Sequence, residues 1–171
     1  TEDMEALTFY AESSNKDDAF FLDDVAVTMT EPPPAPSIEK NLLALKDAVP
    51  FPIGAAVEPD QLLGLQGEML KKHFSCLVAE NVMKPGPIHP KEDVYSWGPA
   101  DQIVQFAGAN RMEMRYHTLL WHSQIGDWFF LDVAGRDMTL ETDSAKREAN
   151  RKLLLKRLED HITAIVGRYK D

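Results

Sequence analysis

Hydrogen-bonding side chains and tryptophans follow two apolar segments of this sequence, in a mixture that suits the binding of a sugar. Glu80, Asn81 and Lys84 come after the apolar run 76–79. A second set follows the next apolar segment and comprises His117, Trp121, His122, Gln124 and Trp128. Charged and amide groups can bind sugar hydroxyls, while indole rings cover the apolar faces of a sugar ring. The two sets together therefore predict a carbohydrate site.

Each of these residues also has a structural interpretation, which remains open at the level of the sequence. Glu80 and Lys84 could form an ion pair that only stabilises the fold. His117, on an apolar segment, could be a hydrogen-bonded histidine of the core. Trp121 and Trp128 could pack in the core or at its rim. The combination of these residues indicates a sugar site more specifically than any one of them does.

Other kinds of chemistry find less support. His117 and His122 are five positions apart on a strand-to-loop segment, so their rings point in different directions and do not predict a metal site. A nucleophilic triad would need a turn such as Gly-x-Ser-x-Gly, which the sequence lacks. Cys76 is the single cysteine, and we interpret it as a buried, inert thiol. No cofactor or metal is expected.

The elements that must position these residues alternate between strands and helices from residue 51 onwards. Ligands of parallel α/β folds bind outside the carboxyl ends of the strands, where the polar residues fall. The order β-α-β-α-β-α predicts a parallel sheet with right-handed crossovers. It fits both an open three-stranded sheet and the start of an eight-stranded barrel. The predicted strands are 51–57, 76–79 and part of 111–121, and the first of them resembles a strand buried on both faces. The predicted helices are 62–74, 99–110 and 144–169, the last with Asp143 or Ser144 as N-cap. The apolar stripe of this last helix comprises Leu154, Leu155, Leu158, Ile162, Ile165, Val166 and Tyr169.

The first fifty residues have a different character. Residues 1–30 contain two β-like runs, too few for a stable domain, and they are interpreted as the end of a β-sandwich. Residues 31–50 form a proline-rich linker and a lead-in helix predicted over 38–48.

Composition narrows the range of partners. The 171 residues include 18 basic and 28 acidic ones, and the formal net charge of −10 argues against binding to nucleic acid. No apolar run approaches the roughly 18 residues of a membrane span, so no membrane partner is expected. No signal peptide opens the sequence, which is expected to be a mature protein or an excised piece.

Three motifs carry a resemblance to a known family. Residues 51–57, 73–85 and 117–124 resemble the opening motifs of family 10 glycoside hydrolases, and 95–97, 100–104 and 127–129 fit as well. This resemblance runs from about residue 51 to the end and implies an α/β fold, with 51–171 as the first three βα units of a (β/α)8 TIM barrel. Residues 9–27 resemble the end of a family 22 xylan-binding module, which is a β-sandwich.

The resemblance also implies an activity, the hydrolysis of internal β-1,4 bonds of xylan with retention. It implies that Glu80, Asn81 and Lys84 hold xylose hydroxyls on the non-reducing side of the cut. His117, Trp121 and Gln124 would line the subsite where the bond breaks, with His122 and Trp128 behind them.

The two catalytic carboxyl groups of such an enzyme, about 5–5.5 Å apart, would follow the fourth and seventh strands, after Asp171. The expected partners are therefore xylan or xylo-oligosaccharides and the C-terminal remainder of the barrel, present either as a separate chain or as a continuation. The isolated chain is expected to be inactive, and the enzyme to be secreted. The alternative is a non-catalytic carbohydrate-binding protein on the same scaffold. Gly86 and Tyr116 depart from the family pattern.

Overall fold

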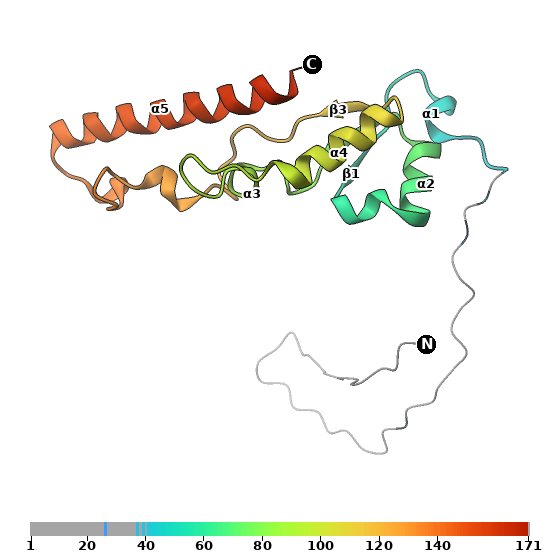
Figure 1. Ribbon diagram of the computed structural model, residues 1–171, viewed down its shortest axis with the longest axis horizontal. Helices are drawn as coiled ribbons and strands as arrows, with labels where there is room; N and C mark the ends of the chain where they lie inside the picture. Colours follow the sequence, from blue (N-terminus) through green and yellow to red (C-terminus); the bar gives the residue numbers. More distant parts are fainter. Residues whose placement is uncertain (1–25, 27–36, 38, 40, 171) are drawn as a thin grey trace, which may run out of the picture. The chain divides into compact units, whose positions relative to one another are not determined.

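A computed structural model describes residues 26, 37, 39 and 41–170 of the chain. The described residues form a parallel sheet of three strands in the order β1-β2-β3. In Figure 1, β1 and β3 lie near helix α4. Val57 at the end of β1 pairs with Ala79 of β2, and Val78 of β2 pairs with Arg115 of β3. The carboxyl ends of the three strands therefore lie at one edge of the sheet. The strands are β1 (Gly54–Val57), β2 (Cys76–Ala79) and β3 (Glu113–Arg115).

Helices connect the strands, which confirms the predicted alternation. Helix α2 (Gly64–His73) links β1 to β2, α4 (Trp97–Ala109) links β2 to β3, and α5 (Ser144–Tyr169) follows β3. Shorter elements lie between them: α1 (Leu45–Ala48), η1 (Pro59–Leu62), α3 (Pro85–Ile88), η2 (Asp127–Phe130) and η3 (Met138–Leu140). None of the helices in the described part is long and apolar enough to span a membrane.

The core forms where α4 packs on the sheet. Leu77 and Ala79 of β2, the central strand, are fully buried, and so is Ile103 of α4, with Ala107 one turn further on. Burying a side chain of the size of leucine or isoleucine contributes about 1.5–3 kcal/mol. The helix was predicted from the sequence over 99–110, and the spacing of its apolar residues directs one face of it to β2.

The C-terminal end of α5 is fixed to α4 by polar contacts around a buried isoleucine. Ile165 is 1% exposed. Tyr169 donates a hydrogen bond of 2.8 Å from its hydroxyl to Oδ1 of Asp101, and Arg168 forms an ion pair with the same carboxylate. The hydrogen bond from Arg168 lowers the pKa of Asp101. The long helix is thus joined to the core at its last turn.

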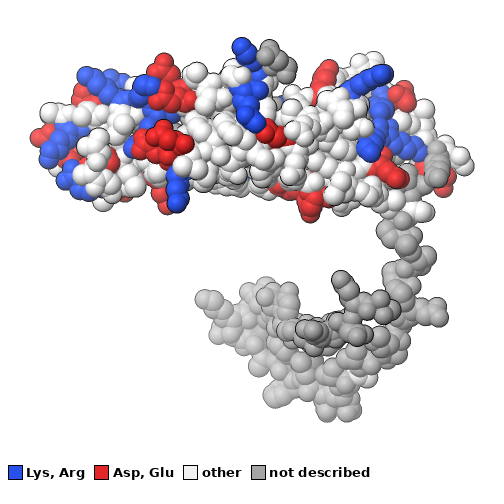
Figure 2. Space-filling model, in the orientation of Figure 1, with Lys and Arg blue, Asp and Glu red and all other residues white. Residues whose placement is uncertain are grey.

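Charged side chains of both signs are intermixed on the visible face (Figure 2). Along α5, Glu148 pairs with Arg151 at 2.9 Å, and Lys156 pairs with Asp160. These pairs are three and four positions apart, the spacing at which side chains meet on a helix surface, and each is worth only a few tenths of a kcal/mol.

Two burial predictions for the sheet were wrong. In β1, Gly54 and Ala56 are exposed, and Phe51 before the strand is 61% exposed. Cys76 is only half-buried. The physical reason is that β1 has a single neighbour, β2, among the described strands, so one face and one edge of the strand lack a cover there.

Two helix predictions also need correction. In the lead-in segment, the described residues form a helix only over Leu45–Ala48. In α5 the apolar stripe is interrupted, since Leu155 and Val166 are 50% and 45% exposed, whereas Arg157 and His161 are buried. These two polar side chains take the buried positions because loop carbonyls and a carboxylate bind them. The predictions for residues 1–30 and for the linker 31–36 lie outside the described residues, apart from residue 26.

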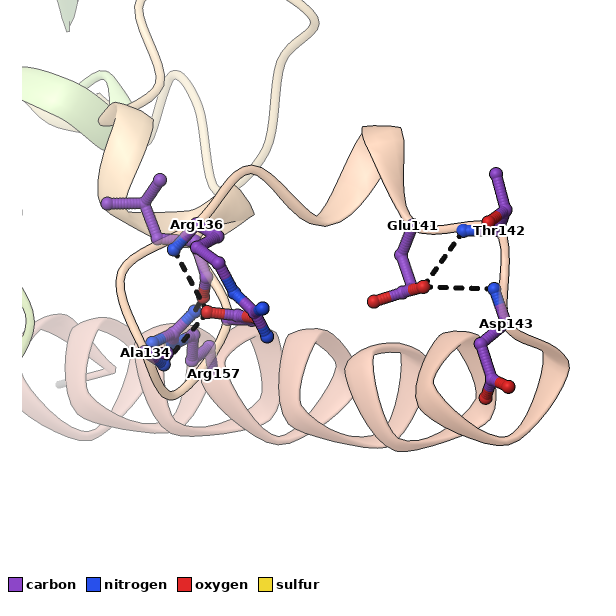
Figure 3. A network of polar contacts seen from close by, with 8 residues as sticks. Ala134, Arg136, Glu141, Thr142, Asp143 and Arg157 are labelled. Carbon is purple, nitrogen blue, oxygen red and sulfur yellow. Dashed lines mark hydrogen bonds and ion pairs between the residues drawn. The ribbon is translucent and has the colours of Figure 1, made fainter.

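Helix α5 begins at a well-formed cap. Oδ1 of Asp143 accepts a hydrogen bond of 2.9 Å from the backbone N–H of Lys146, so Asp143 rather than Ser144 is the N-cap. Just before it, Oε1 of Glu141 accepts from the backbone N–H groups of Thr142 and Asp143, at 3.0 and 2.9 Å (Figure 3). The turn and the helix start are therefore both fixed by carboxylates.

We expect Asp143→Ala to lower the free energy of unfolding by about 1 kcal/mol, the usual value of an N-cap. Ser144→Ala is the matched control and should change it by less than about 0.5 kcal/mol. Denaturant unfolding of the protein, followed by circular dichroism, measures both. Equal losses for the two variants would contradict the assignment of the cap.

Candidate functional site

Three of the predicted sugar-binding side chains meet at the carboxyl edge of the sheet. Oδ1 of Asn81, just after β2, accepts hydrogen bonds from Nζ of Lys84 at 2.9 Å and from Nε2 of Gln124 at 3.3 Å. Asn81 and Gln124 come from the loops that follow β2 and β3, so the parallel sheet brings them together. The amide oxygen of Asn81 is the centre of the cluster.

The ammonium group of Lys84 is held from two sides. Its side chain is only 8% exposed, and Nζ lies 4.7 Å from the ring centroid of Trp121. A lysine has three donors, and Asn81 accepts from one of them. An indole face beside a fixed ammonium provides both apolar and hydrogen-bonding contacts for a polyol.

Glu58 belongs to the same cluster, although we did not single it out from the sequence. Its Oε1 accepts a hydrogen bond of 2.7 Å from Nδ2 of Asn81. The Asn81 side chain is thereby oriented with its oxygen toward Lys84 and Gln124. Glu58 directly follows β1, just as Glu80 follows β2, so the strand-end rule applied to β1 would have identified it.

The other two predicted residues lie at the same edge without joining this network. Glu80 is exposed, and its backbone N–H donates to the oxygen of Val57 at 3.0 Å. Among the described residues no ion pair joins Glu80 to Lys84, so the structural interpretation of that pair was wrong. His117 is half-buried after β3. Both residues thus follow their strands at the carboxyl edge of the sheet.

The two residues predicted to stand behind the site take different positions. His122 is exposed and lies edge-on to Trp121, with ring centroids 5.2 Å apart at 71°. Trp128 packs elsewhere: its Nε1 donates to the oxygen of His89 at 3.0 Å, and its ring stacks on Phe129. Trp128 therefore joins the segment after β3 to the end of α3.

Gly86 and Tyr116, which depart from the family pattern, support the backbone of the site. The N–H of Gly86 donates to the oxygen of Gln124 at 2.6 Å, and a Cβ at this position would lie 2.8 Å from that oxygen. The hydroxyl of Tyr116 donates to the oxygen of Met83 at 2.9 Å, and burial raises the pKa of this tyrosine. The Gly86 contact joins the loops that follow β2 and β3, and the Tyr116 contact fixes Met83, the residue before Lys84.

Arg157 of α5 holds two of the surrounding loops. This side chain is 8% exposed; it donates to both carboxylate oxygens of Glu92 at 2.7 Å and to the oxygen of Leu131 at 2.6 Å. The hydrogen bonds from Arg157 lower the pKa of Glu92. A bidentate guanidinium–carboxylate pair fixes geometry as well as charge.

The loop held by Arg157 has its own internal support. Oδ1 of Asp132 accepts from the backbone N–H groups of Ala134 and Arg136 at 2.8 and 2.9 Å, and the Arg136 guanidinium binds Oδ2 (Figure 3). Hydrogen bonds from the backbone and side chain of Arg136 lower the pKa of Asp132 to about 2. The turn therefore keeps its shape over a wide pH range and presents the Leu131 carbonyl to Arg157.

Taken together, the groups at the sheet edge can bind sugar hydroxyls and cover a sugar face. The donors are the ammonium of Lys84 and the amide of Gln124, Glu80 offers an exposed acceptor, and Trp121 offers an indole ring. The carboxylate of Glu58 is already engaged by Asn81 and by the η1 cap.

Comparison with known proteins places this geometry in a family. The model of glycosyl hydrolase family 10 matches residues 42–171. Endo-1,4-beta-xylanase A of Halalkalibacterium halodurans is 56% identical over 121 residues, which are 71% of this chain and 31% of the relative.

Solved structures of xylanases agree with this family assignment. Xylanase B of Clostridium stercorarium F9 superposes with a TM-score of 0.75 at 55% identity, covering 76% of this chain and 39% of that one. A mutant of the intracellular xylanase of Thermoanaerobacterium saccharolyticum, in complex with xylotriose, superposes with a TM-score of 0.67 at 40% identity, covering 78% and 40%. The chain thus spans between 31% and 40% of the length of these relatives. Its sheet and helices are part of the α/β TIM-barrel fold, and the chain belongs to glycosyl hydrolase family 10.

Proposed function

We propose that this chain is part of an endo-1,4-β-xylanase that hydrolyses internal bonds of xylan with retention of configuration. The observation that carries the proposal is the cluster of Asn81, Lys84 and Gln124 beside the Trp121 ring, at the carboxyl ends of parallel strands. Ligands of TIM barrels bind at this face. The relatives named xylanase, one of them bound to xylotriose, support the choice of sugar.

Within this site we assign two groups of roles. Glu80, Asn81 and Lys84 hold xylose hydroxyls on the non-reducing side of the cut. His117, Trp121 and Gln124 line the subsite where the bond breaks, and His122 supports Trp121. The contacts between the two groups through Asn81 mean that neighbouring subsites are mechanically linked.

The catalytic carboxylates belong to the part of the barrel that follows Asp171 in this proposal. Strands β1 and β3 each have one neighbour among the described strands, whereas a barrel needs both edges of every strand to be paired. A cavity of about 250 Å³ beside β3, lined by apolar side chains of α4, β3 and α5, offers a surface for the remaining elements. That remainder is therefore the expected protein partner, either as a separate chain or as a continuation.

Two further assignments are part of the proposal. Residues 9–27 are the end of a family 22 xylan-binding module, which would increase the local concentration of the polymer. The enzyme acts outside the cell, because xylan lies there. The Thermoanaerobacterium saccharolyticum relative is described as intracellular, so fractionation of the source cells, with activity assayed in medium and lysate, decides this point.

We expect the 171-residue chain alone to release no reducing sugar from β-1,4-xylan, and the full-length protein that contains it to do so. Intact-mass spectrometry must accompany the assay, because a nicked partner could remain bound. A single 19.3 kDa species that cleaves xylan would contradict the placement of the catalytic carboxylates. A full-length protein that binds xylan without cleaving it would favour a binding-only protein.

Lys84→Met in the full-length protein should raise KM for xylan by roughly 10–100-fold, as expected for a lost hydrogen bond to a charged group. Methionine retains the buried stem and removes the ammonium. Lys91→Met, at an exposed lysine of the same segment, is the matched control and should leave KM within about twofold. If both variants behave like the unmodified enzyme, Lys84 does not bind the sugar.

A further inference from the structure

A buried pair of histidines lies against the loop that carries the second set of site residues. His89, at the end of α3, is 3% exposed, and His161 of α5 is fully buried. Their Nδ1 atoms are 3.0 Å apart, and their rings are parallel within 3°. We call residues 117–124 the sugar-binding loop.

The second ring nitrogen of His161 contacts this loop. Its Nε2 lies 3.0 Å from the oxygen of Leu119, which is two residues from both His117 and Trp121. A carbonyl oxygen only accepts hydrogen bonds, so this Nε2 must carry the hydrogen. His161 thus holds the loop by its backbone, between the two site residues.

That hydrogen bond determines the protonation of both rings. In neutral His161 the hydrogen is on Nε2, so its Nδ1 is a bare acceptor. His89 must then donate from its own Nδ1, which leaves its Nε2 without a hydrogen. This Nε2 is buried and has no hydrogen-bond partner among the described residues. A third hydrogen added to the pair would therefore have to sit on Nε2 of His89.

The surroundings of His89 are unfavourable for a charge at that position. Its ring stacks on Tyr95 at 3.9 Å, and Trp128 and Phe129 lie at 4.5 and 5.8 Å. A buried cation with an unpaired N–H is unfavourable, because it loses its hydration and no acceptor among the described residues replaces the water. Burial, reinforced by His161, lowers the pKa of His89 to about 4.

The charged groups around the pair do not reverse the lowering of the His89 pKa. Glu92 and Asp93, from the segment between α3 and α4, act to raise the pKa of His89, but burial has the larger effect. Arg157, one turn before His161 on α5, has its guanidinium bound to Glu92, and Asp160 is exposed beside Tyr95. Element η2 contributes the rings of Trp128 and Phe129, the segment between α3 and α4 contributes that of Tyr95, and the sugar-binding loop contributes the Leu119 carbonyl.

We propose that the neutral His89–His161 pair is a positioning element for the sugar-binding loop: it holds the Leu119 carbonyl, sets the places of His117 and Trp121, and loosens when it is protonated. The inference rests on the proposed function for its consequence, which is weaker binding of xylo-oligosaccharides in acid. The arrangement of hydrogens is independent of that function.

The direction of the pH dependence follows from the lowered pKa. Between the ordinary value of 6.5 and about 4, an opened or unfolded chain binds a proton at His89 more readily than the closed one. Acid in this range therefore favours opening. The stabilisation by the pair is complete above pH 6.5 and is lost as the pH falls toward 4.

The first experiment is 15N NMR of the full-length protein with labelled histidine, assigned with His89→Gln and His161→Gln. At pH 7 we expect hydrogens on Nδ1 of His89 and on Nε2 of His161. Most exposed neutral histidines carry the hydrogen on Nε2, so the His89 form is distinctive. A charged ring, or a hydrogen on Nε2 of His89, at pH 7 would overturn the proposal.

The second experiment measures xylotriose binding and xylan hydrolysis at pH 7. His161→Ala should weaken xylotriose binding and raise KM by about tenfold, with a smaller change in kcat. His161→Gln should restore most of the loss, because its amide N–H can donate to Leu119. Thr163→Ala, on the exposed face of α5, should change neither. A glutamine variant as impaired as the alanine variant, or a fall in kcat alone, would refute the positioning role.

A third variant keeps the test decisive if His161→Ala does not fold. In His89→Gln, the amide oxygen of the new glutamine can accept a hydrogen bond from Nδ1 of protonated His161. Nε2 of His161 still donates to the Leu119 oxygen. The rise in KM between pH 6.5 and 4.5 should therefore be smaller than in the unmodified enzyme, and an unchanged rise would count against the proposal. Failure of the unmodified protein to bind xylotriose would instead overturn the proposed function, and the NMR result would still decide the state of the pair.

Discussion

The parallel register of the three strands is the constraint on which the rest of the site depends. Because Val57 pairs with Ala79 and Val78 pairs with Arg115, the residues that follow each strand emerge at one edge. Glu58 and Asn81 are 23 positions apart in sequence, and yet they share a hydrogen bond there. A slip of one residue would turn the side chains of a strand to the opposite face, and the cluster around Asn81 would be lost.

The loops above this edge contact one another, as through Gly86 and Gln124, and they are also stabilised by polar side chains from a helix. Irregular loops contain backbone carbonyls that need donors when they are buried. Arg157 supplies donors to Phe129 and Leu131, and His161 supplies one to Leu119. Helix α5 is therefore both a layer of the fold and the support of the two loops after the second and third strands.

The sequence allowed the local features to be predicted and left the distant pairings open. The strand 76–79 and the helix 144–169 were predicted with the bounds observed, because apolar spacing and the Asp143 cap are local signals. The exposure of β1 was missed, because burial depends on which strands lie beside it. The pairs His89–His161 and Glu92–Arg157 are 72 and 65 positions apart, and no spacing rule links them. For the site, the strand-end rule predicted the places of Asn81, Lys84 and Gln124, and the residue types predicted a carbohydrate ligand. The subsite assigned to each residue rested on family resemblance.

The close approach of Gly86 to Gln124 has a consequence for how such a site can diversify. No Cβ fits against the Gln124 carbonyl with the backbone in its present place, so any larger residue at 86 must displace the loop that carries Trp121 and Gln124. A substitution at position 86 thereby changes the shape of the loop that carries Gln124, without replacement of any side chain that we propose as a sugar ligand. Mutational libraries at position 86 offer engineers an indirect route to altered substrate preference, through backbone displacement rather than new chemistry.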